Sequence, residues 1–399
     1  MSVEWSCLTL LYIVYMYHLF FRRLRQSLPG CTFLLLAILL VAGSCSTVPE
    51  PELLLGGDIS LLPSYEQHGT VYRDSAGNAV EPLAFFRDNG WNAIRVRLFV
   101  EPDSAPGEHK DEGVCQDLDY VSSFGKRIKE AGFRFMLDFH YSDTWADPGK
   151  QFIPARWANH SVEALCDSVG SYTRQVLQRL VSDGAEPELI QVGNEITNGM
   201  LWPVGRLNHD GKDNYDVLCS MIGSGVKACR EVCPKARLII HTEKAGEWPV
   251  TKEFYDQLKV HGTDYDIIGL SYYPMWHDRI PVLGATLDSI AARYPEKEVM
   301  IVETAAYYSH ENDKWATPDQ FSEFYSISPE GQTAFTRELV AELKHHDNVK
   351  GLFWWFPEEN ACGNSLVKSW INRGLFDNRT GRVLPAFREF CRYGADNRQ

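Results

Sequence analysis

The sequence predicts a (β/α)8 barrel, a TIM barrel of the α/β class, formed by a single domain over residues 53–399. Short runs of β-branched and other apolar residues recur along this part of the chain. Each run is followed by a stretch with helical periodicity, which is typical of βαβ units and a parallel sheet. Eight such runs occur, the number of strands that closes a barrel. A doubly wound sheet is not supported, since the sequence has neither a GxGxxG turn nor a phosphate-binding loop.

The eight predicted strands are separated by predicted amphipathic helices, for example over Leu118–Glu130 and Val162–Leu180. Gly132 and Gly184 stand where helix C-caps are expected, and each leads into the next strand. The predicted strands cover Leu53–Ser60, Asn92–Phe99, Arg134–Tyr141, Leu189–Ile196, Ala236–Glu243, Tyr265–Tyr273, Glu298–Ala305 and Val349–Pro357.

Residues 1–45 are predicted to be a lipoprotein signal peptide. Arginines at positions 22, 23 and 25 precede an apolar run at residues 31–42, and small residues then stand directly before Cys45. Cys45 would become the lipidated first residue, and residues 46–52 a short tether. The apolar run is too short for an ordinary transmembrane helix, and an uncleaved membrane anchor is the alternative. The pattern predicts an exported bacterial outer-membrane lipoprotein that faces the cell surface.

Charge and composition favour a neutral ligand. The formal net charge is −14, which argues against nucleic acid or an anionic polymer as the main ligand, because like charges repel. Hydrophobic residues at 44% and charged residues at 23% are ordinary for a globular protein, which excludes a disordered or polytopic membrane chain. Eleven Trp and eighteen Tyr residues serve either as core filling or as flat surfaces for sugar rings.

The cysteines do not form a disulfide framework. Of ten cysteines, seven lie beyond Cys45, an odd number without regular spacing. Cys229 and Cys233 are four residues apart on a predicted helix, and we interpret them as buried thiols rather than as metal ligands. No CxxC pair occurs.

Two glutamates stand where catalytic groups of such barrels are found, at the carboxyl ends of strands. Glu195 ends the fourth predicted strand, and Glu303 lies near the end of the seventh, 108 residues later. Hydrolysis of a glycosidic bond needs one protonated and one ionised carboxyl group, and a separation of about 5–5.5 Å gives retention of configuration. We therefore predict Glu195 as general acid/base and Glu303 as nucleophile. The alternative is that either glutamate forms an ion pair on the rim.

Arginine and amide side chains are predicted to support the two carboxylates. Arg95 or Arg97 would lie beside Glu303 and keep it ionised, and that negative charge would raise the pKa of Glu195. Strand alternation places both arginines in the lumen. Asn194 directly precedes Glu195, where an amide can bind the sugar 2-hydroxyl.

Strand alternation also selects one tyrosine. Gly269, Ser271 and Tyr273 share the inward face of the sixth strand, so Tyr273 rather than Tyr272 should reach Glu303. For the arginines and the tyrosine alike, ordinary packing of the lumen is the alternative.

His140 ends the third predicted strand within the run LDFHYSDTWADP and is predicted to support the site. With Asp143 and Asp147 it raises the possibility of a metal centre. The run lacks the further histidines that such barrel sites use, so no metal is predicted.

Substrate contacts are predicted from residues on loops and strand ends. Trp145, Trp202 and Trp355 are candidates for stacking on sugar rings, with core packing as the alternative for each. Asp58, at the end of the first strand, and Asp143 are the predicted polar contacts.

Along nearly the whole chain beyond Cys45 the sequence resembles glycoside hydrolase family 53, the arabinogalactan endo-β-1,4-galactanases of clan A. The resemblance implies retaining endo-hydrolysis of β-1,4-galactan, with release of galacto-oligosaccharides, by Glu195 as acid/base and Glu303 as nucleophile. It implies no cofactor and a polysaccharide partner. The motifs that carry it are GGDISLLPSYEQHG at residues 56–69, NAIRVRLF at 92–99, LDFHYSDTWADP at 137–148, QVGNEITNGMLWP at 191–203, GLSYYP at 269–274, IVET at 301–304 and GLFDNRTGRVLPAF at 374–387.

The sequence departs from the family pattern at two places. Members commonly have Trp-Glu-Pro after the eighth strand, whereas this chain has Trp355, Phe356 and Pro357. Some bacterial members carry an Asp-Gly-Asp-Gly-His-Gly-Asn calcium loop after the seventh strand. The segment Tyr307–Asp319 has no such run of oxygen ligands, so no calcium is predicted there.

Two other functions remain open at this stage. One is another clan-A glycosidase, such as a mannanase or an exo-acting galactosidase. The other is a non-catalytic, surface-anchored glycan-binding lipoprotein. Such a protein is expected to lack one of the two carboxylates, and both are present here.

Overall fold

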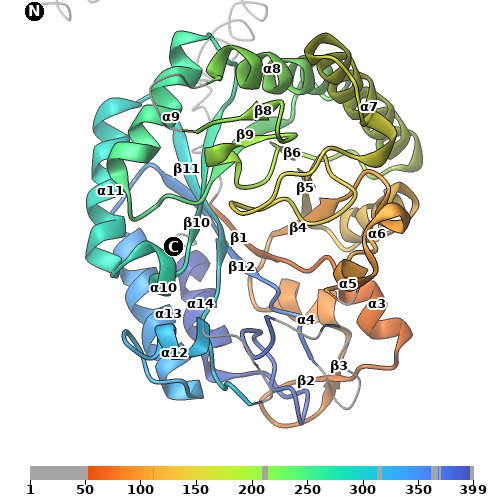
Figure 1. The fold of residues 1–399 in the computed structure, drawn as a ribbon. Helices are drawn as coiled ribbons and strands as arrows, with labels where there is room; N and C mark the ends of the chain where they lie inside the picture. The colour runs from red at the N-terminus through yellow and green to blue at the C-terminus, as the bar shows by residue number, and fades with distance from the viewer. Residues whose placement is uncertain are drawn as a thin grey trace, which may run out of the picture. The chain divides into compact units, whose positions relative to one another are not determined.

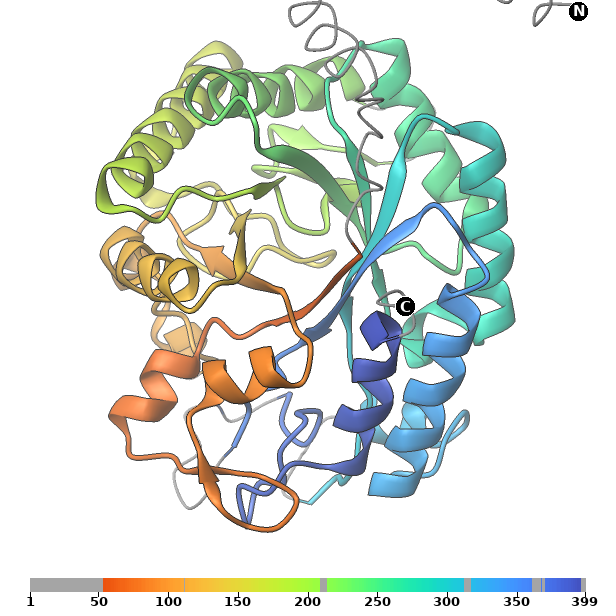
Figure 2. The same cartoon turned by 180° about the vertical axis from the view of Figure 1, so that it is seen from behind.

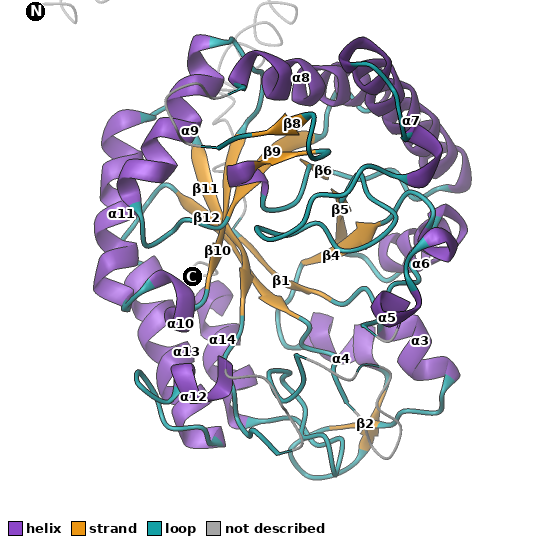
Figure 3. Ribbon diagram, in the orientation of Figure 1, coloured by secondary structure: helices purple, strands orange, loops and turns teal. Residues whose placement is uncertain are grey.

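A computed structural model describes residues 53–110, 112–208, 214–311, 317–360, 367 and 370–395. Eight parallel strands form a closed barrel, and helices surround it (Figures 1 and 3). The predicted (β/α)8 fold is therefore confirmed. The strands follow one another around the barrel in the order β1 (Leu54–Asp58), β12 (Val349–Trp355), β11 (Glu298–Thr304), β10 (Ile267–Tyr272), β9 (Arg237–Thr242), β6 (Leu189–Val192), β5 (Arg134–Phe139) and β4 (Ala93–Leu98).

Side chains alternate between the lumen and the helical layer, as the pleat of a strand requires. On β4, Ile94, Val96 and Leu98 belong to the core between the sheet and the helices, whereas Ala93 belongs to a separate apolar layer in the lumen. That layer closes the amino-terminal end of the barrel, so polar side chains are confined to the opposite end. Its members are Leu54, Ala93, Met136, Leu189, Ile239, Ile267, Met300, Val302 and Phe353.

Helix ends coincide with capping residues. Ser161 accepts a hydrogen bond from the Ala164 amide at the start of α7, and Gly184 ends that helix with a φ of 80°.

The α13 and α14 helices lie side by side in both views (Figures 1 and 2). The helices are α3 (Leu62–Gln67), α4 (Pro82–Asp88), α5 (Gly107–Lys110), α6 (Leu118–Glu130), α7 (Val162–Asp183), α8 (Tyr215–Val232), α9 (Trp248–Val260), α10 (Pro274–His277), α11 (Ile280–Arg293), α12 (Thr317–Phe321), α13 (Pro329–Leu343) and α14 (Pro385–Ala395).

All eight predicted strands are present, although most end earlier than predicted. The largest difference is at β6, which ends at Val192 rather than Ile196, because Gly193 and Glu195 adopt positive φ values of 88° and 48° and turn the chain. Two short hairpins were not predicted: β2 (Tyr72–Arg73) with β3 (Ala79–Val80), and β7 (Gly199–Met200) with β8 (Gly205–Arg206).

Three 3-10 turns complete the described elements. They are η1 (Pro102–Ser104), η2 (Ala155–Trp157) and η3 (Ile196–Asn198).

The interpretation of Cys229 and Cys233 as buried thiols is confirmed, since both are buried and free. Within the described residues, no group of three or more His, Cys, Asp or Glu side chains could hold a metal ion.

The predicted signal peptide (residues 1–45), its lipidated Cys45 and the tether (46–52) lie outside the described residues. In the part of the chain that the structure describes, no helix has both the length and the apolar composition of a membrane span.

Candidate active site

A cavity of about 500 Å³ opens at the carboxyl ends of the barrel strands. All eight β-strand ends or their following loops contribute side chains to it, which is where barrel enzymes carry their catalytic groups. The sequence-predicted residues that line the cavity are Asp58, Arg95, Arg97, His140, Trp145, Asn194, Glu195, Tyr273, Glu303 and Trp355.

The backbone turn after β6 presents Glu195 to the cavity. Its φ and ψ of 48° and 53° are left-handed, a conformation that is uncommon for a residue other than glycine. Strain of this kind concentrates at functional sites, where the surrounding structure holds it in place. Here the η3 turn follows Glu195 at once, and Gln151 donates from its amide nitrogen to the Asn194 carbonyl oxygen at 2.9 Å.

The surroundings of Glu195 favour its protonated form. Burial raises the pKa of Glu195 well above its ordinary value, and the negative charges of Glu303 and Glu243 raise it further. The Ser271 hydroxyl donates to Glu195 Oε1 at 2.6 Å and opposes this rise. Ser271 in turn lies 2.9 Å from His241 Nε2. The net effect of these contacts is to favour the protonated form of Glu195, as a general acid requires.

Two partners of Glu303 favour its ionised form. Burial raises the pKa of Glu303, and the Arg95 guanidinium and the Tyr273 hydroxyl limit that rise. Arg95 Nη2 lies 2.9 Å from Glu303 Oε1, and the Tyr273 hydroxyl donates to Glu303 Oε2 at 3.1 Å. The tyrosine that reaches Glu303 is thus the one that strand alternation selected.

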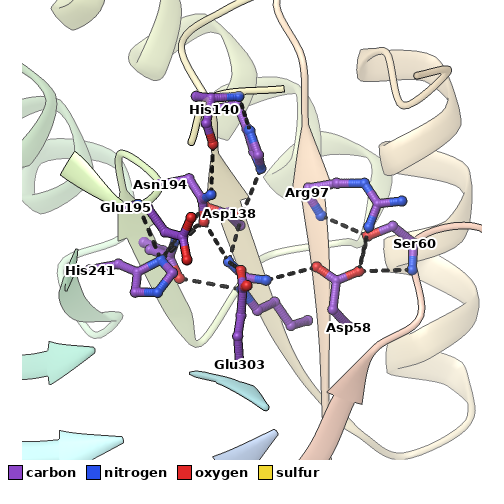
Figure 4. A network of polar contacts seen from close by, with 12 residues as sticks. Asp58, Ser60, Arg97, Asp138, His140, Asn194, Glu195, His241 and Glu303 are labelled. Carbon is purple, nitrogen blue, oxygen red and sulfur yellow. Dashed lines mark hydrogen bonds and ion pairs between the residues drawn. The ribbon is translucent and has the colours of Figure 1, made fainter. Parts of the chain in front are cut away.

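Arg95 is the centre of a buried charge network. Figure 4 labels other members of this network, Asp58, Arg97, Asp138 and Glu303. Besides Glu303, the Arg95 guanidinium binds Asp58 at 2.9 Å and Asp138 at 2.8 Å. Arg97 binds the other oxygen of Asp58 at 2.9 Å. Because buried charges are costly unless paired, this network fixes the position of its members.

The Asn194 side chain is held from several directions. Its oxygen accepts from Arg95 and Gln191, at 2.9 and 3.0 Å, and its nitrogen donates to the Ala146 carbonyl at 2.9 Å. An amide nitrogen has two hydrogens, so one remains for a ligand in the cavity.

His140 lies behind the charge network. Its Nε2 is 3.1 Å from Asp138 Oδ2, and its Nδ1 accepts from the Ala146 amide at 3.0 Å. These contacts place the imidazole proton on Nε2 and connect His140 to Arg95 through Asp138.

Four tryptophans line the cavity, two predicted and two not. The Trp145 and Trp355 ring centroids are 6.2 Å apart, and the Arg97 guanidinium covers one face of Trp145 at 4.4 Å. Trp276 and Trp370 contact each other edge to face at 5.6 Å. Trp276 is 43% exposed, so much of its apolar surface is available to a ligand.

Two predicted substrate contacts are not among the residues that line the cavity. The Trp202 indole donates to the Asn198 carbonyl at 3.0 Å, and the Arg206 guanidinium lies over its ring at 4.4 Å. Asp143 is buried and accepts from the Ala155 amide at 2.7 Å, so it stabilises its own loop. Asp58 lines the cavity, yet both of its oxygens are bound to the arginines.

Sequence reasoning did not identify several residues that complete the site. Asp138 and Ser271 lie two residues before His140 and Tyr273 and share their inward faces, so for these two the two-residue period was the available signal. The missed residues in or beside the cavity are Asp138, Gln191, His241, Glu243, Ser271, Trp276, Trp370 and Arg373.

Comparison with known proteins identifies the family. The model of Glycosyl hydrolase family 53 matches residues 54–390. The arabinogalactan endo-β-1,4-galactanase of Thermothelomyces thermophilus is 31% identical over 345 residues, which cover 84% of this chain and 98% of that protein. The family 53 catalytic domain of Ignisphaera aggregans superposes with a TM-score of 0.77 at 29% identity, covering 86% of this chain and 97% of that one.

A solved structure from work on two fungal β-1,4-galactanases is also similar. It superposes with a TM-score of 0.72 at 30% identity and covers 85% of this chain and 99% of its own. The family model spans nearly all of the described barrel, and its two ends fall in β1 and α14. The chain belongs to glycosyl hydrolase family 53.

Proposed function

We propose that this enzyme hydrolyses internal β-1,4-galactosidic bonds of galactan and type I arabinogalactan, which are side chains of pectin, with retention of configuration. The observation that carries the proposal is a pair of carboxyl groups in one cavity with unequal partners. Burial and neighbouring negative charges raise the pKa of Glu195 well above its ordinary value, whereas Glu303 faces a guanidinium and a hydroxyl that favour its anion. Retaining glycosidases need this unequal pair.

In the first step, Glu303 attacks the anomeric carbon while Glu195 transfers its proton to the departing glycosidic oxygen. The carbon–oxygen bond to the leaving sugar breaks, and an ester bond to Glu303 forms. Tyr273 and Arg95 each hold one oxygen of Glu303, so the nucleophile is oriented before the substrate binds.

In the second step, the ionised Glu195 removes a proton from water, which attacks the anomeric carbon and releases Glu303. Loss of the negative charge on Glu303 during the first step lowers the pKa of Glu195, since that charge is one cause of its raised value. The same residue can therefore act first as acid and then as base. The free hydrogen of the Asn194 amide would bind the sugar 2-hydroxyl in both transition states.

The galactan substrate is supported by the names of the relatives, among them the Thermothelomyces galactanase. The tryptophans that line the cavity offer apolar faces for successive pyranose rings. The deciding experiment is a panel of galactan, mannan, xylan and glucan with products resolved by size. A ladder of galacto-oligosaccharides is expected. Release of galactose alone from the earliest times, or cleavage of mannan instead, would overturn the substrate proposal.

Retention is tested separately by proton NMR of the first product formed from a galacto-oligosaccharide. The β-anomer is expected to appear first and then to mutarotate. Initial formation of the α-anomer would mean a single displacement by water and would remove Glu303 from its role as nucleophile.

We also propose that the enzyme is exported and attached to the bacterial outer membrane through a lipid on Cys45. The support is the sequence pattern before Cys45, which lies outside the described residues. Mass spectrometry of the mature amino terminus is expected to find a diacylglyceryl-modified cysteine at position 45. An unmodified chain that begins before Cys45 would refute the anchor.

A further inference from the structure

The cavity contains a third arginine that differs from Arg95 and Arg97. Those two share the buried carboxylate of Asp58. Arg373 also lines the cavity and is only 2% exposed, but within the described residues it forms no ion pair. Its hydrogen bond to described residues runs from Nε to the Trp370 carbonyl at 3.4 Å, and no acceptor among the described residues is recorded for its terminal nitrogens.

Aromatic rings hold the Arg373 guanidinium. Its central carbon lies 4.8 Å from the ring centroids of both Trp355 and Trp370, and 5.4 Å from that of Tyr307. Aromatic faces stabilise a cation without accepting its N–H hydrogen bonds in the ring plane. The N–H donors of the planar guanidinium are therefore fixed in orientation and still available to a ligand.

The chain itself does not neutralise this charge fully. Glu359 is an acidic residue whose pKa the Arg373 charge lowers, and the two form no ion pair among the described residues. The amide of Asn372 donates to Glu359 at 3.0 Å, and burial raises the pKa of Glu359 to about 7, so much of this carboxyl is uncharged near neutral pH. Residues 361–369, which precede Arg373, contain no Asp or Glu.

Arg373 lies on the Glu303 side of the cavity. Its guanidinium carbon is 6.0 Å from the ring centroid of Tyr273, whose hydroxyl binds Glu303. Trp355, at the end of β12, is next to β11 and Glu303 in the barrel order. This is the side that receives the sugar bonded to the nucleophile and the residues that precede it in the polymer.

We propose that Arg373 binds the carboxylate of an acidic sugar residue, so that the enzyme favours a galactan in which a uronic acid occupies the glycone side of the cleavage site. The inference rests on the proposed galactanase function and adds a substrate feature to it. A planar carboxylate matches the two parallel N–H groups of a guanidinium, which a hydroxyl does not.

The remaining charges of the cavity limit the acidic residue to one position. Asp147 and Glu303 also line the wall, and their negative charges oppose a second carboxylate bound beside them. A polymer that is acidic throughout is therefore excluded, in agreement with the strongly negative net charge of the chain.

The test uses β-1,4-galactotetraose and its isomers in which one galactosyl residue is replaced by galacturonosyl, a change confined to C6. For the wild-type enzyme, one isomer is expected to exceed the neutral tetrasaccharide in kcat/KM by about tenfold or more, as for a hydrogen bond to a charged group. Arg373→Gln should remove this preference while the neutral substrate is still cleaved. Arg373→Lys should keep part of it, because the charge remains without the planar fork.

Arg206→Gln is the matched control, since Arg206 also lies over a tryptophan ring but does not line the cavity. Binding of each tetrasaccharide to the Glu303→Gln variant, measured by calorimetry, gives the same comparison without turnover. Equal affinity for all tetrasaccharides, or an equal loss for neutral and acidic ones in Arg373→Gln, would overturn the inference and leave Arg373 as a packing residue. Absence of cleavage of the neutral tetrasaccharide by the wild type would instead refute the galactanase function.

Discussion

Buried carboxyl groups have different bonding partners on two walls of the same cavity. On the wall formed by β1, β4 and β5, carboxylates alternate with guanidinium groups at 2.8–2.9 Å. On the wall formed by β6, β9 and β10, Glu195 and Glu243 are bound by the hydroxyl groups of Ser271 and Thr197 instead. The difference lies in the partner rather than in the degree of burial.

The consequence is a different protonation state on each wall. Burial acts to raise the pKa of Asp138, but the charges of Arg95 and His140 outweigh it and hold that pKa below its ordinary value. Burial raises the pKa of Glu243 to about 7, because a hydroxyl hydrogen bond from Thr197 opposes desolvation only in part. Glu303, which faces Arg95, belongs electrostatically to the first wall, so a nucleophile and a proton donor lie across one cavity.

Removal of the nucleophile is expected to have the largest effect on activity. Glu303→Gln keeps the size of the side chain but abolishes its charge, and turnover of galactan is expected to fall by about 10⁴-fold or more. Affinity for galactan should stay close to that of the wild type, as measured by calorimetry. Near-normal turnover in this variant would mean that another group attacks the sugar.

Removing the proton donor should have a smaller effect that depends on the leaving group. Glu195→Gln is expected to lower kcat/KM on galactan by about 10²- to 10⁴-fold. An aryl β-1,4-galactobioside with an acidic phenol needs little protonation, so its first step should be much less affected. Equal losses on both substrates would contradict the role of Glu195 as acid.

Removing the shared cation tests the charged wall directly. Arg95→Met leaves Asp58, Asp138 and Glu303 without a guanidinium partner, and the free energy of unfolding is expected to fall by about 3–5 kcal/mol. Urea denaturation measures the loss. Arg95→Lys is the control, since it retains the charge and should lose less free energy of unfolding. An Arg95→Met variant as stable as the wild type would show that the network does not depend on ion pairs.

The mildest change concerns Glu243. Ionisable groups that act on it or on Glu195 are Glu303, Lys244 and Glu247. The negative charge of Glu243 raises the pKa of Glu195, and Glu195 must be protonated to act as acid. Glu243→Gln should therefore move the alkaline limb of the pH profile of kcat/KM toward lower pH.

The matched control is Glu253→Gln, which makes the same charge change on the exposed surface of α9. It should leave the alkaline limb in place. A Glu243→Gln profile that overlays the wild type would show that the second wall does not tune the acid.

Strand periodicity predicted the features that depend on one strand at a time. It gave the eight strands, the inward faces of Arg95 and Arg97, and the choice of Tyr273 over Tyr272. It did not identify Asp138 or His241, because their importance comes from contacts with residues on other strands, such as the Asp138 contact with Arg95. A strand pattern contains no information on such pairings.

Loop residues were the least predictable. Trp202 and Trp145 look alike in sequence, since both follow a strand end, but only Trp145 lines the cavity. The Trp202 indole binds a backbone carbonyl in its own loop, an interaction that depends on a turn no periodicity describes. Arg373 reaches the cavity after a long connection from β12. Its position could not be predicted for the same reason, because no periodicity describes that connection.

The closure of the barrel has a consequence for biosynthesis. The first strand, β1, pairs with the last, β12, and Asp58 at its end binds both arginines of β4. A nascent chain that has emerged from the ribosome as far as Glu303 still lacks the last strand, Val349–Trp355. Without that strand the barrel is open, and the lumen beneath the two glutamates is incomplete. Saccharide cleavage therefore begins only after translation of nearly the entire polypeptide.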